Sequence, residues 1–315
     1  MRAKKIFEPG WMRALILLPF WAARFFYYAV RERSLPFLRF YPGYHGSTIP
    51  SGKFLARNRA RIFNPAATAG DGINLNRDGQ RLMLEKLTTF YPGFTPPAQP
   101  SPGRLYHYDN PMFGFSDAFV LYGVFRSFEP RRVIEIGSGF SSALMLDISK
   151  DFLPSTRFTF IDPYSETIRR VLHARPEGNY ELLRTEIQDV DAQIFSSLEA
   201  GDVLFIDTSH TVKIASDLCS ILFGILPVLK TGVLVHIHDI VFPWEYPEEM
   251  VSAGRSYNEL YFVRAFLQYN NAFEILFNSS QMERECHEHY MTKMPGYFKD
   301  AGQTTGQSLW LRKLA

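Results

Sequence analysis

Cysteine is nearly absent from this 315-residue sequence, and neither sign of charge dominates it. The two cysteines, Cys219 and Cys286, lie far apart, so they form neither a disulfide framework nor a zinc-binding spacing. Lysine and arginine number 34 and aspartate and glutamate 32, which leaves a net charge of +2, and no nucleic-acid-binding motif is present. We therefore expect a protein of a reducing, cytoplasmic compartment without a nucleic-acid partner.

The sequence also lacks an uninterrupted transmembrane run. Residues 11–30 are rich in apolar and aromatic side chains, but Arg24 lies deep among them and would cost ~2.5–3.5 kcal/mol in a spanning helix. Ala22-Ala23-Arg24 is a poor cleavage site for a signal peptide. We expect a helix that lies in the membrane interface, on the inner face. Packing of this helix on the rest of the chain, or on a second subunit of a homo-oligomer, is the open alternative.

Composition divides the chain into three segments. Residues 1–34 hold the apolar and basic helix, and residues 35–105 form an irregular extension rich in proline and glycine, with one helix near residues 78–89. Residues 106–315 alternate short apolar strands with helices, which is typical of a parallel sheet covered on both faces. The expected fold is α/β, a Rossmann-like, doubly wound, seven-stranded and mostly parallel sheet with an antiparallel last strand. Strands are expected at residues 133–136, 157–161, 180–183, 203–206, 233–237, 273–277 and 308–312. Helices are expected at 118–128, 165–174, 192–200, 213–226 and 258–269, with irregular chain from 278 to 306.

Residues 132–142, RVIEIGSGFSS, are the stretch around which this last segment is organised. Gly137 and Gly139 end a buried strand and a helix follows, so backbone N–H groups and a positive helix end surround a ligand. A dinucleotide fingerprint would have a third glycine where Ser142 stands, and Glu135 would lie awkwardly beside a pyrophosphate. The turn therefore favours a cofactor without phosphate groups.

Two later strand ends carry polar side chains suited to the rest of such a cofactor. Asp162 closes the second strand, where a carboxylate accepts hydrogen bonds from ribose hydroxyls. Gln188 and Asp189 follow the third strand. A local alternative stays open for both acids, because Asp162 is also placed to cap the next turn and Asp189 the next helix.

Together these features resemble the class I S-adenosylmethionine-dependent methyltransferases over about residues 105–315. The stretches DNPMFGFSDAFVLY, VIEIGSGFSSALMLD, LFIDTSH and VLVHIHDIVFPWEYP are similar to a bacterial group of that superfamily that acts on sugars or glycolipids. The resemblance implies S-adenosylmethionine as the cofactor and an O-methylation reaction. It implies that the following residues bind the cofactor: Glu135, Gly137, Ser138, Gly139 and Ser142 at the methionine end, Asp162 at the ribose, Gln188 and Asp189 at the adenine, and Asp207.

The acceptor chemistry is expected at the ends of the fourth and fifth strands. Asp207 and His210 follow one, and His238 and Asp239 follow the other, so neighbouring strands would bring them together. The set is similar to that of metal-aided sugar O-methyltransferases and cephalosporin hydroxylase-like proteins, except that His238 stands where an acidic residue is usual. The resemblance implies a divalent metal ion on Asp207, His238 and Asp239. An imidazole ligand favours Mn²⁺ or Fe²⁺ over Mg²⁺.

His210 is the expected general base, because histidine titrates near neutral pH and a sugar hydroxyl must lose its proton. The alternative for residues 207–210 is a helix-capping turn, and His236 is expected to be a core residue. We expect a methyltransferase that acts on a small-molecule or glycolipid hydroxyl. An oxidoreductase or hydroxylase-like enzyme on the same fold, and a membrane-tethered binding protein without catalysis, are the alternatives.

Overall fold

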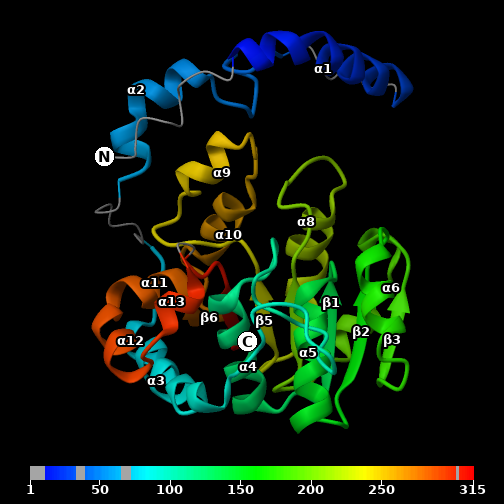
Figure 1. The fold of residues 1–315 in the computed structure, drawn as a ribbon, viewed down its shortest axis with the longest axis vertical. Coiled ribbons are helices and arrows are strands. Elements are labelled where there is room, and N and C mark those ends of the chain that lie inside the picture. The colour runs from blue at the N-terminus through cyan, green and yellow to red at the C-terminus, as the bar shows by residue number, and fades with distance from the viewer. Residues whose placement is uncertain (1–10, 33–39, 65–71, 303–304) are drawn as a thin grey trace. The chain divides into compact units, whose positions relative to one another are not determined.

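The computed structural model describes residues 11–32, 40–64, 72–302 and 305–315 (Figure 1). Contacts between Cα atoms group the chain into two compact units. One unit comprises residues 1–66 and 246–256, and the other comprises residues 67–245 and 257–315. The boundaries expected from composition, after residues 34 and 105, stay predictions.

The larger unit is built on one seven-stranded sheet with the strand order β3-β2-β1-β4-β5-β7-β6. The strands from β1 to β5 pair in parallel, whereas β7 runs antiparallel to both of its neighbours, β5 and β6. The predicted fold class is therefore confirmed, including the antiparallel last strand. The strands are β1 (Arg132–Ile136), β2 (Arg157–Ile161), β3 (Tyr180–Leu183), β4 (Val203–Ile206), β5 (Leu234–Ile237), β6 (Phe273–Asn278) and β7 (Leu309–Lys313).

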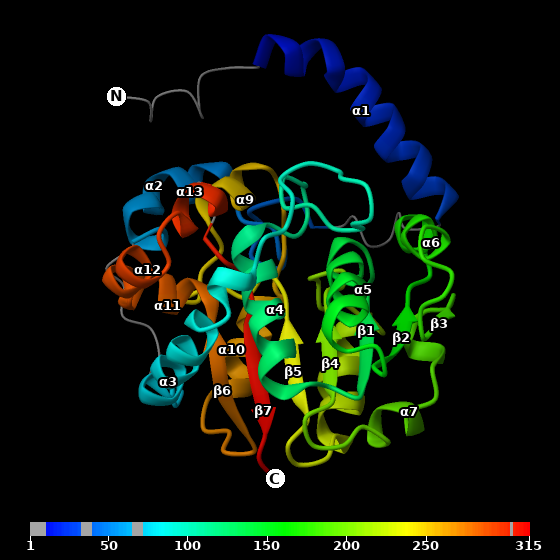
Figure 2. The same ribbon diagram turned by 60° about the horizontal axis from the view of Figure 1, so that its bottom comes forward.

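The central strands β4 and β5 are buried on both faces. Every residue of both strands is buried, which accounts for sequences that are apolar throughout except for His236 in β5. Helices α4 (Phe115–Phe128) and α5 (Phe140–Phe152) lie in front of the sheet in Figure 2, and α10 (Glu259–Leu267) lies behind it. The first eleven residues of α4 are all buried, so this helix fills the core from one face.

The strand order reverses between β1 and β4, which lie side by side but are separated in sequence by two other strands. Ligands of open α/β sheets bind beyond the carboxyl ends of the strands at such a reversal. The turn after β1 and the loops after β4 and β5 meet at that edge.

Two expectations about helices need correction. The helix expected over residues 213–226 begins later and changes type along its length, from α8 (Asp217–Ser220) to a π-helical turn (Ile221–Ile225) and a 3₁₀ turn (Leu226–Val228). Ser216 caps α8 by accepting from the N–H of Cys219, so the helix begins later than the apolar pattern does. Pro227 lacks an N–H and lies in the 3₁₀ turn, so it cannot donate to the hydrogen-bond pattern of the preceding helix.

The stretch expected to be irregular, 278–306, instead contains α11 (Ser279–Glu285), α12 (His287–Lys293) and α13 (Tyr297–Ala301). Each of these short helices buries one apolar or aromatic side chain, namely Met282, Tyr290 or Tyr297. One apolar anchor per helix is too few to give a periodic signal. The remaining helices of the unit are α3 (Arg77–Thr88), α6 (Glu166–His173) and α7 (Gln193–Ser196), the last shorter than the helix expected at 192–200.

The smaller unit contains α1 (Trp11–Arg31), α2 (Gly52–Ile62) and α9 (Glu248–Ser252). The guanidinium of Arg59 on α2 donates to both carboxylate oxygens of Glu248 on α9, at 2.5 and 2.6 Å. Within the described ranges, no helix has the length and apolar character needed to cross a membrane.

Candidate functional site

The glycine turn after β1 lies directly against the backbone after β4. Gly137 has a φ of +77°, and a Cβ atom built on it would come within 1.7 Å of the carbonyl oxygen of Asp207. Only glycine fits this position, because both the left-handed backbone and the close approach exclude a side chain. The turn and the end of β4 are therefore fixed relative to each other without an intervening side chain.

Glu135, the last but one residue of β1, is completely buried beneath this turn. Its carboxyl group accepts hydrogen bonds from the hydroxyls of Ser141 and Ser142 in the first turn of α5. The Ser142 hydroxyl in turn accepts from the N–H of Gly139 at 2.9 Å. Burial raises the pKa of Glu135 to about 8, although the two serine hydroxyls oppose the shift. Glu135 and Ser142 thus brace the turn from below.

A cavity of about 820 Å³ opens beside the turn, which is ample room for a cofactor of nucleoside size. It collects most of the residues that the sequence assigned to the cofactor, but not all of them. The side chains of three predicted residues, Glu135, Ser142 and Asp189, do not line it. The structure therefore does not place them for direct contact with a molecule in the cavity. The predicted residues that do line it are Gly137, Ser138, Gly139, Asp162, Gln188, Asp207 and His210.

Asp162 lines the cavity and also holds two loops. One carboxylate oxygen accepts from the hydroxyl of Ser138 at 2.9 Å, and the other accepts from the N–H groups of Tyr164 and Ser165 at 2.8 and 3.1 Å. The capping alternative is therefore present in the structure, and it coexists with a position on the cavity wall. Gln188 lines the same cavity and donates to the carbonyl oxygen of Ala215 at 3.0 Å.

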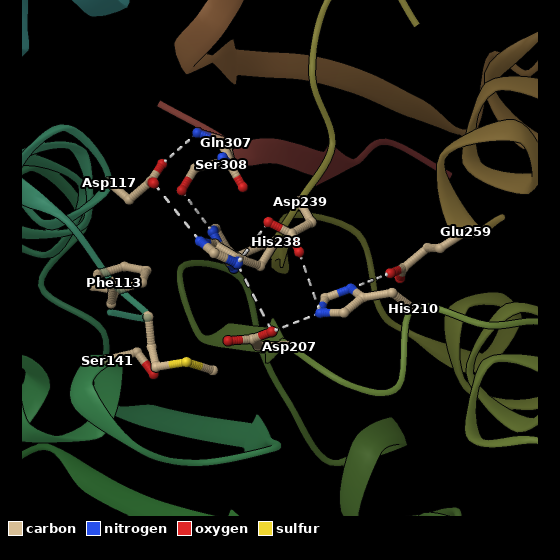
Figure 3. A network of polar contacts seen from close by, with 12 residues as sticks. Phe113, Asp117, Ser141, Asp207, His210, His238, Asp239, Glu259, Gln307 and Ser308 are labelled. Atoms are coloured by element: carbon tan, nitrogen blue, oxygen red, sulfur yellow. Dashed lines mark hydrogen bonds and ion pairs between the residues drawn. The ribbon is translucent and has the colours of Figure 1, made fainter. Parts of the chain in front are cut away.

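Asp207 and His210, which line the cavity, belong to a network of carboxylates and imidazoles (Figure 3). Nε2 of His210 lies 3.3 Å from a carboxylate oxygen of Asp207 and 3.5 Å from one of Asp239. The loops after β4 and β5 contribute these residues, as the pairing of the two strands predicts. The sequence prediction that strand ends bring Asp207, His210 and Asp239 together is confirmed.

Glu259 completes the surroundings of His210, and the sequence analysis missed it. Its carboxylate lies 2.8 Å from Nδ1 of His210, and the side chain is almost entirely buried at the start of α10. Asn258 and Glu259 also donate their backbone N–H groups to the carbonyl oxygen of His210, at 3.1 and 3.3 Å. His210 has a φ of +54°, in the left-handed region that non-glycine residues rarely adopt. The ring and backbone of His210 are therefore both fixed by the N-terminus of α10.

These contacts determine the charges in the network. Burial alone would lower the pKa of His210, but hydrogen bonds to Asp207 and Glu259 raise it well above its usual range. Burial would raise the pKa of Asp207, but His238 and His210 lower it to about 2. In the unliganded chain Asp207 is thus ionised, and His210 is a positively charged imidazolium at neutral pH.

His238 does not have the character of a metal ligand. Its Nδ1 faces Asp207 and Asp239 at 3.7 and 3.5 Å, and its Nε2 faces Asp117 at 3.6 Å. Burial lowers its pKa, but the surrounding carboxylates outweigh burial and raise it to about 9. An imidazole protonated on both nitrogens has no lone pair to offer a metal ion.

The predicted metal set of Asp207, His238 and Asp239 is therefore not supported. Across the part of the chain that the structure describes, no group of three or more His, Cys, Asp and Glu side chains is arranged to hold a metal ion. Asp117, at the start of α4, instead fixes this end of the network by accepting from the N–H of Gln307 at 2.8 Å.

His236 lies one pleat before His238 and is a core residue, as expected. It is fully buried, its ring stacks on Phe205 at 3.7 Å, and its Nε2 lies 2.9 Å from the hydroxyl of Ser308. Burial lowers its pKa well below the usual range, so the ring is neutral.

Comparison with known proteins gives a family match and a relative of moderate identity. A family model described as a methyltransferase domain matches residues 134–240, from β1 to the loop after β5. An uncharacterized protein of Archaeoglobus fulgidus is 34% identical over 167 residues, which are 51% of this chain and 74% of that protein.

Solved structures are similar at lower identity. The S-adenosylhomocysteine-bound methyltransferase PaMTH1 of Podospora anserina is 14% identical, with a TM-score of 0.41, over 86% of this chain and 100% of that one. The O-methyltransferase TomG of Streptomyces achromogenes, in complex with S-adenosylmethionine, is 12% identical, with a TM-score of 0.41, over 74% of this chain and 89% of that one.

The domain match begins in the strand that carries the glycine turn and ends just past Asp239. It therefore includes most of the residues that line the cavity, together with the ends of β4 and β5. The chain therefore contains a methyltransferase domain, which its residues 134–240 place on the seven-stranded sheet.

Proposed function

We propose that this methyltransferase methylates a hydroxyl group of a sugar, a glycolipid or a related small molecule. The observation that supports the proposal most is that a single cavity is lined both by the glycine turn and by Asp207 and His210. A methyl donor and a group able to take a proton would then meet in the same space, as in-line transfer to a hydroxyl requires.

The residues of the cavity suit S-adenosylmethionine in this proposal. Gly137, Ser138 and Gly139 offer a turn without side-chain obstruction, Asp162 offers a carboxylate for hydroxyl groups, and Asp207 offers a negative charge. When bound, the cofactor supplies an electrophilic methyl group on a positively charged sulfonium.

His210 would accept the proton of the acceptor hydroxyl at Nε2, while Glu259 accepts from Nδ1 and keeps the ring oriented. In the unliganded chain both ring nitrogens are protonated, so Nε2 would first release its proton to water in the cavity. This loss would be favoured by the positive sulfonium of a bound cofactor beside Asp207, because that charge weakens the attraction between Asp207 and the imidazolium of His210. Because His238 does not fit a metal ion, the proposed mechanism contains no metal-dependent step.

Two measurements test the proposal together. Titration calorimetry should give micromolar affinity for S-adenosylhomocysteine and no binding of NAD(H), whereas the reverse would support an oxidoreductase. The protein should then be incubated with isotope-labelled S-adenosylmethionine and a panel of sugars, glycolipids, phenols and amines, with products read by mass spectrometry. Label on a hydroxyl oxygen is the expected result. Label on nitrogen would contradict O-methylation, and cofactor binding without transfer to any acceptor would favour a binding protein.

A further inference from the structure

Helix α1 of the smaller unit has no buried side chain among those that the structure describes. From residue 19 to residue 31, all described side chains of α1 are exposed, and most of them are apolar or aromatic. The exposed fractions are 61% for Phe20, 56% for Phe25, 63% for Phe26, 60% for Tyr27, 43% for Tyr28 and 59% for Val30. Apolar and aromatic side chains in this number are normally covered. The unit to which α1 belongs covers none of those described, so the helix is suited to an apolar environment outside that unit.

The charges on α1 have one sign. The helix contains Arg13, Arg24 and Arg31 and no aspartate or glutamate. The guanidinium carbon of Arg24 lies 5.7 Å from the centre of the Tyr28 ring, and that of Arg31 lies 5.9 Å from the same ring. The guanidinium groups of Arg24 and Arg31 therefore lie beside an aromatic ring on the helix surface instead of on a separate polar face.

We propose that α1 binds the surface of a lipid bilayer that contains anionic lipids. Aromatic rings are favoured at the boundary between headgroups and acyl chains, where an apolar body and a polar edge are both satisfied. Arginine places its aliphatic stem in the same zone while its guanidinium reaches the lipid phosphates. The helix is too interrupted by arginine to span the bilayer, so it lies along the surface.

Charge argues for the bilayer over a second copy of the chain. In a symmetric dimer the same patch meets itself, so α1 would face α1 across a two-fold axis. Arginines would then be brought near the arginines of the partner. Glu32, just after the helix, pairs with Arg31 of the same chain at 3.3 Å, and the helix itself carries no acidic residue. An anionic lipid surface supplies the opposite charge along the whole helix.

Flotation of the full chain with lipid vesicles tests the proposal. We expect flotation with vesicles of phosphatidylcholine and phosphatidylglycerol, and much weaker flotation with phosphatidylcholine alone. The double variant Arg24→Gln/Arg31→Gln should bind the mixed vesicles about 30-fold more weakly, because each of the two arginines contributes a similar share of the binding free energy at an anionic surface. The variant Phe25→Ser/Phe26→Ser should lose flotation with both kinds of vesicle.

A matched control removes apolar side chains that are equally exposed on other helices. Leu82 on α3 and Phe223 in the π-helical turn are 72% and 70% exposed, so Leu82→Ser/Phe223→Ser should float like the unmodified chain. Circular dichroism and thermal unfolding would confirm that each variant is folded. Equal flotation of Phe25→Ser/Phe26→Ser and the unmodified chain, or no flotation with anionic vesicles, would overturn the proposal. A dimer in light scattering that Phe25→Ser/Phe26→Ser dissociates would overturn it too, and would assign the helix to a second copy.

Discussion

The carboxylate of Glu259 lies 2.8 Å from Nδ1 of His210, although 49 positions separate the two residues in sequence. This contact leaves Nε2 as the nitrogen that faces Asp207 and the cavity. Glu259 would not touch the substrate, so we regard it as a positioning residue for the proposed base. We expect Glu259→Gln to lower kcat by ~10²-fold, the lower end of what a general base contributes, with KM for the cofactor nearly unchanged.

Glu259→Gln should also change the pKa of His210, which a purely structural role of Glu259 would leave unchanged. Removing this negative charge should lower the pKa of His210, because Glu259 is one of the groups that raises it. Histidine-selective NMR titration measures the shift without any acceptor. An unchanged pKa of His210 would contradict the positioning role, and Glu259→Asp, which keeps the charge, should lie between the variant and the unmodified chain.

His210→Ala should reduce turnover by ~10²–10⁴-fold and leave the affinity for S-adenosylhomocysteine nearly unchanged. The dependence of kcat/KM on pH tests the direction in which the pKa of His210 is shifted. Since the pKa of His210 is raised, the unprotonated base becomes more abundant as pH rises above neutrality, and kcat/KM should increase in that direction. Glu259→Gln should move the rise to lower pH, and His210→Ala should abolish it. Normal turnover of His210→Ala on its acceptor would remove this residue from the mechanism.

Asp162 is expected to bind the ribose, and Asp162→Ala tests it. A hydrogen bond to a charged group contributes ~1.5–3 kcal/mol, so the Kd for S-adenosylhomocysteine should rise about 10- to 150-fold. Calorimetry measures this directly. Asp189, which does not line the cavity, supplies the control, and Asp189→Ala should leave the Kd unchanged. Equal affinities of Asp162→Ala and the unmodified chain would restrict Asp162 to its observed capping of the loop.

Gly137→Ala should destabilise the chain strongly, because its Cβ would lie 1.7 Å from a backbone oxygen. We expect a loss of at least ~3 kcal/mol, the upper end of single substitutions, measured by denaturant unfolding. Gly103 has a nearly identical φ of +79°, but a Cβ atom added there would have nothing within 4 Å. Gly103→Ala therefore measures the cost of the backbone conformation alone, and a similar loss in both variants would contradict the role of the close contact.

The sequence predicted those parts of the fold and site that depend on regular strands. The alternation of apolar strands and helices predicts the sheet. The adjacency of β4 and β5 predicts that Asp207 and Asp239 lie close together. Glu259 could not be found in this way, because a glutamate in the first turn of a helix is also what the helix dipole favours. Its contact with His210 depends on the path of the intervening loop, for which the sequence has no periodic signal. The position of Asp117 beside His238 could not be read from a periodic pattern either. Burial lowers the pKa of His238, but Asp207, Asp117 and Asp239 together raise it, so that a proposed metal ligand is an imidazolium in this chain.

Glu135 gives a prediction about stability that does not need the acceptor. Its pKa in the folded chain is about 8, above the ordinary value near 4.5, because it is buried beneath the glycine turn. The folded state therefore holds a proton that the unfolded state releases once pH exceeds the ordinary value. This contribution to stability is complete in acid and is lost as pH rises, by up to about 1.4 kcal/mol per pH unit until the folded pKa is passed.

Glu135→Gln keeps a neutral side chain of the same shape that can still bond Ser141 and Ser142. Thermal unfolding of the two proteins should be compared at several pH values between 5 and about 8, the interval over which only the unfolded glutamate is ionised. The difference in free energy of unfolding should shift progressively in favour of Glu135→Gln as pH rises. If that difference does not change with pH, Glu135 is ionised throughout in the folded chain, and its carboxylate is stabilised by the serine hydroxyls more strongly than burial opposes it.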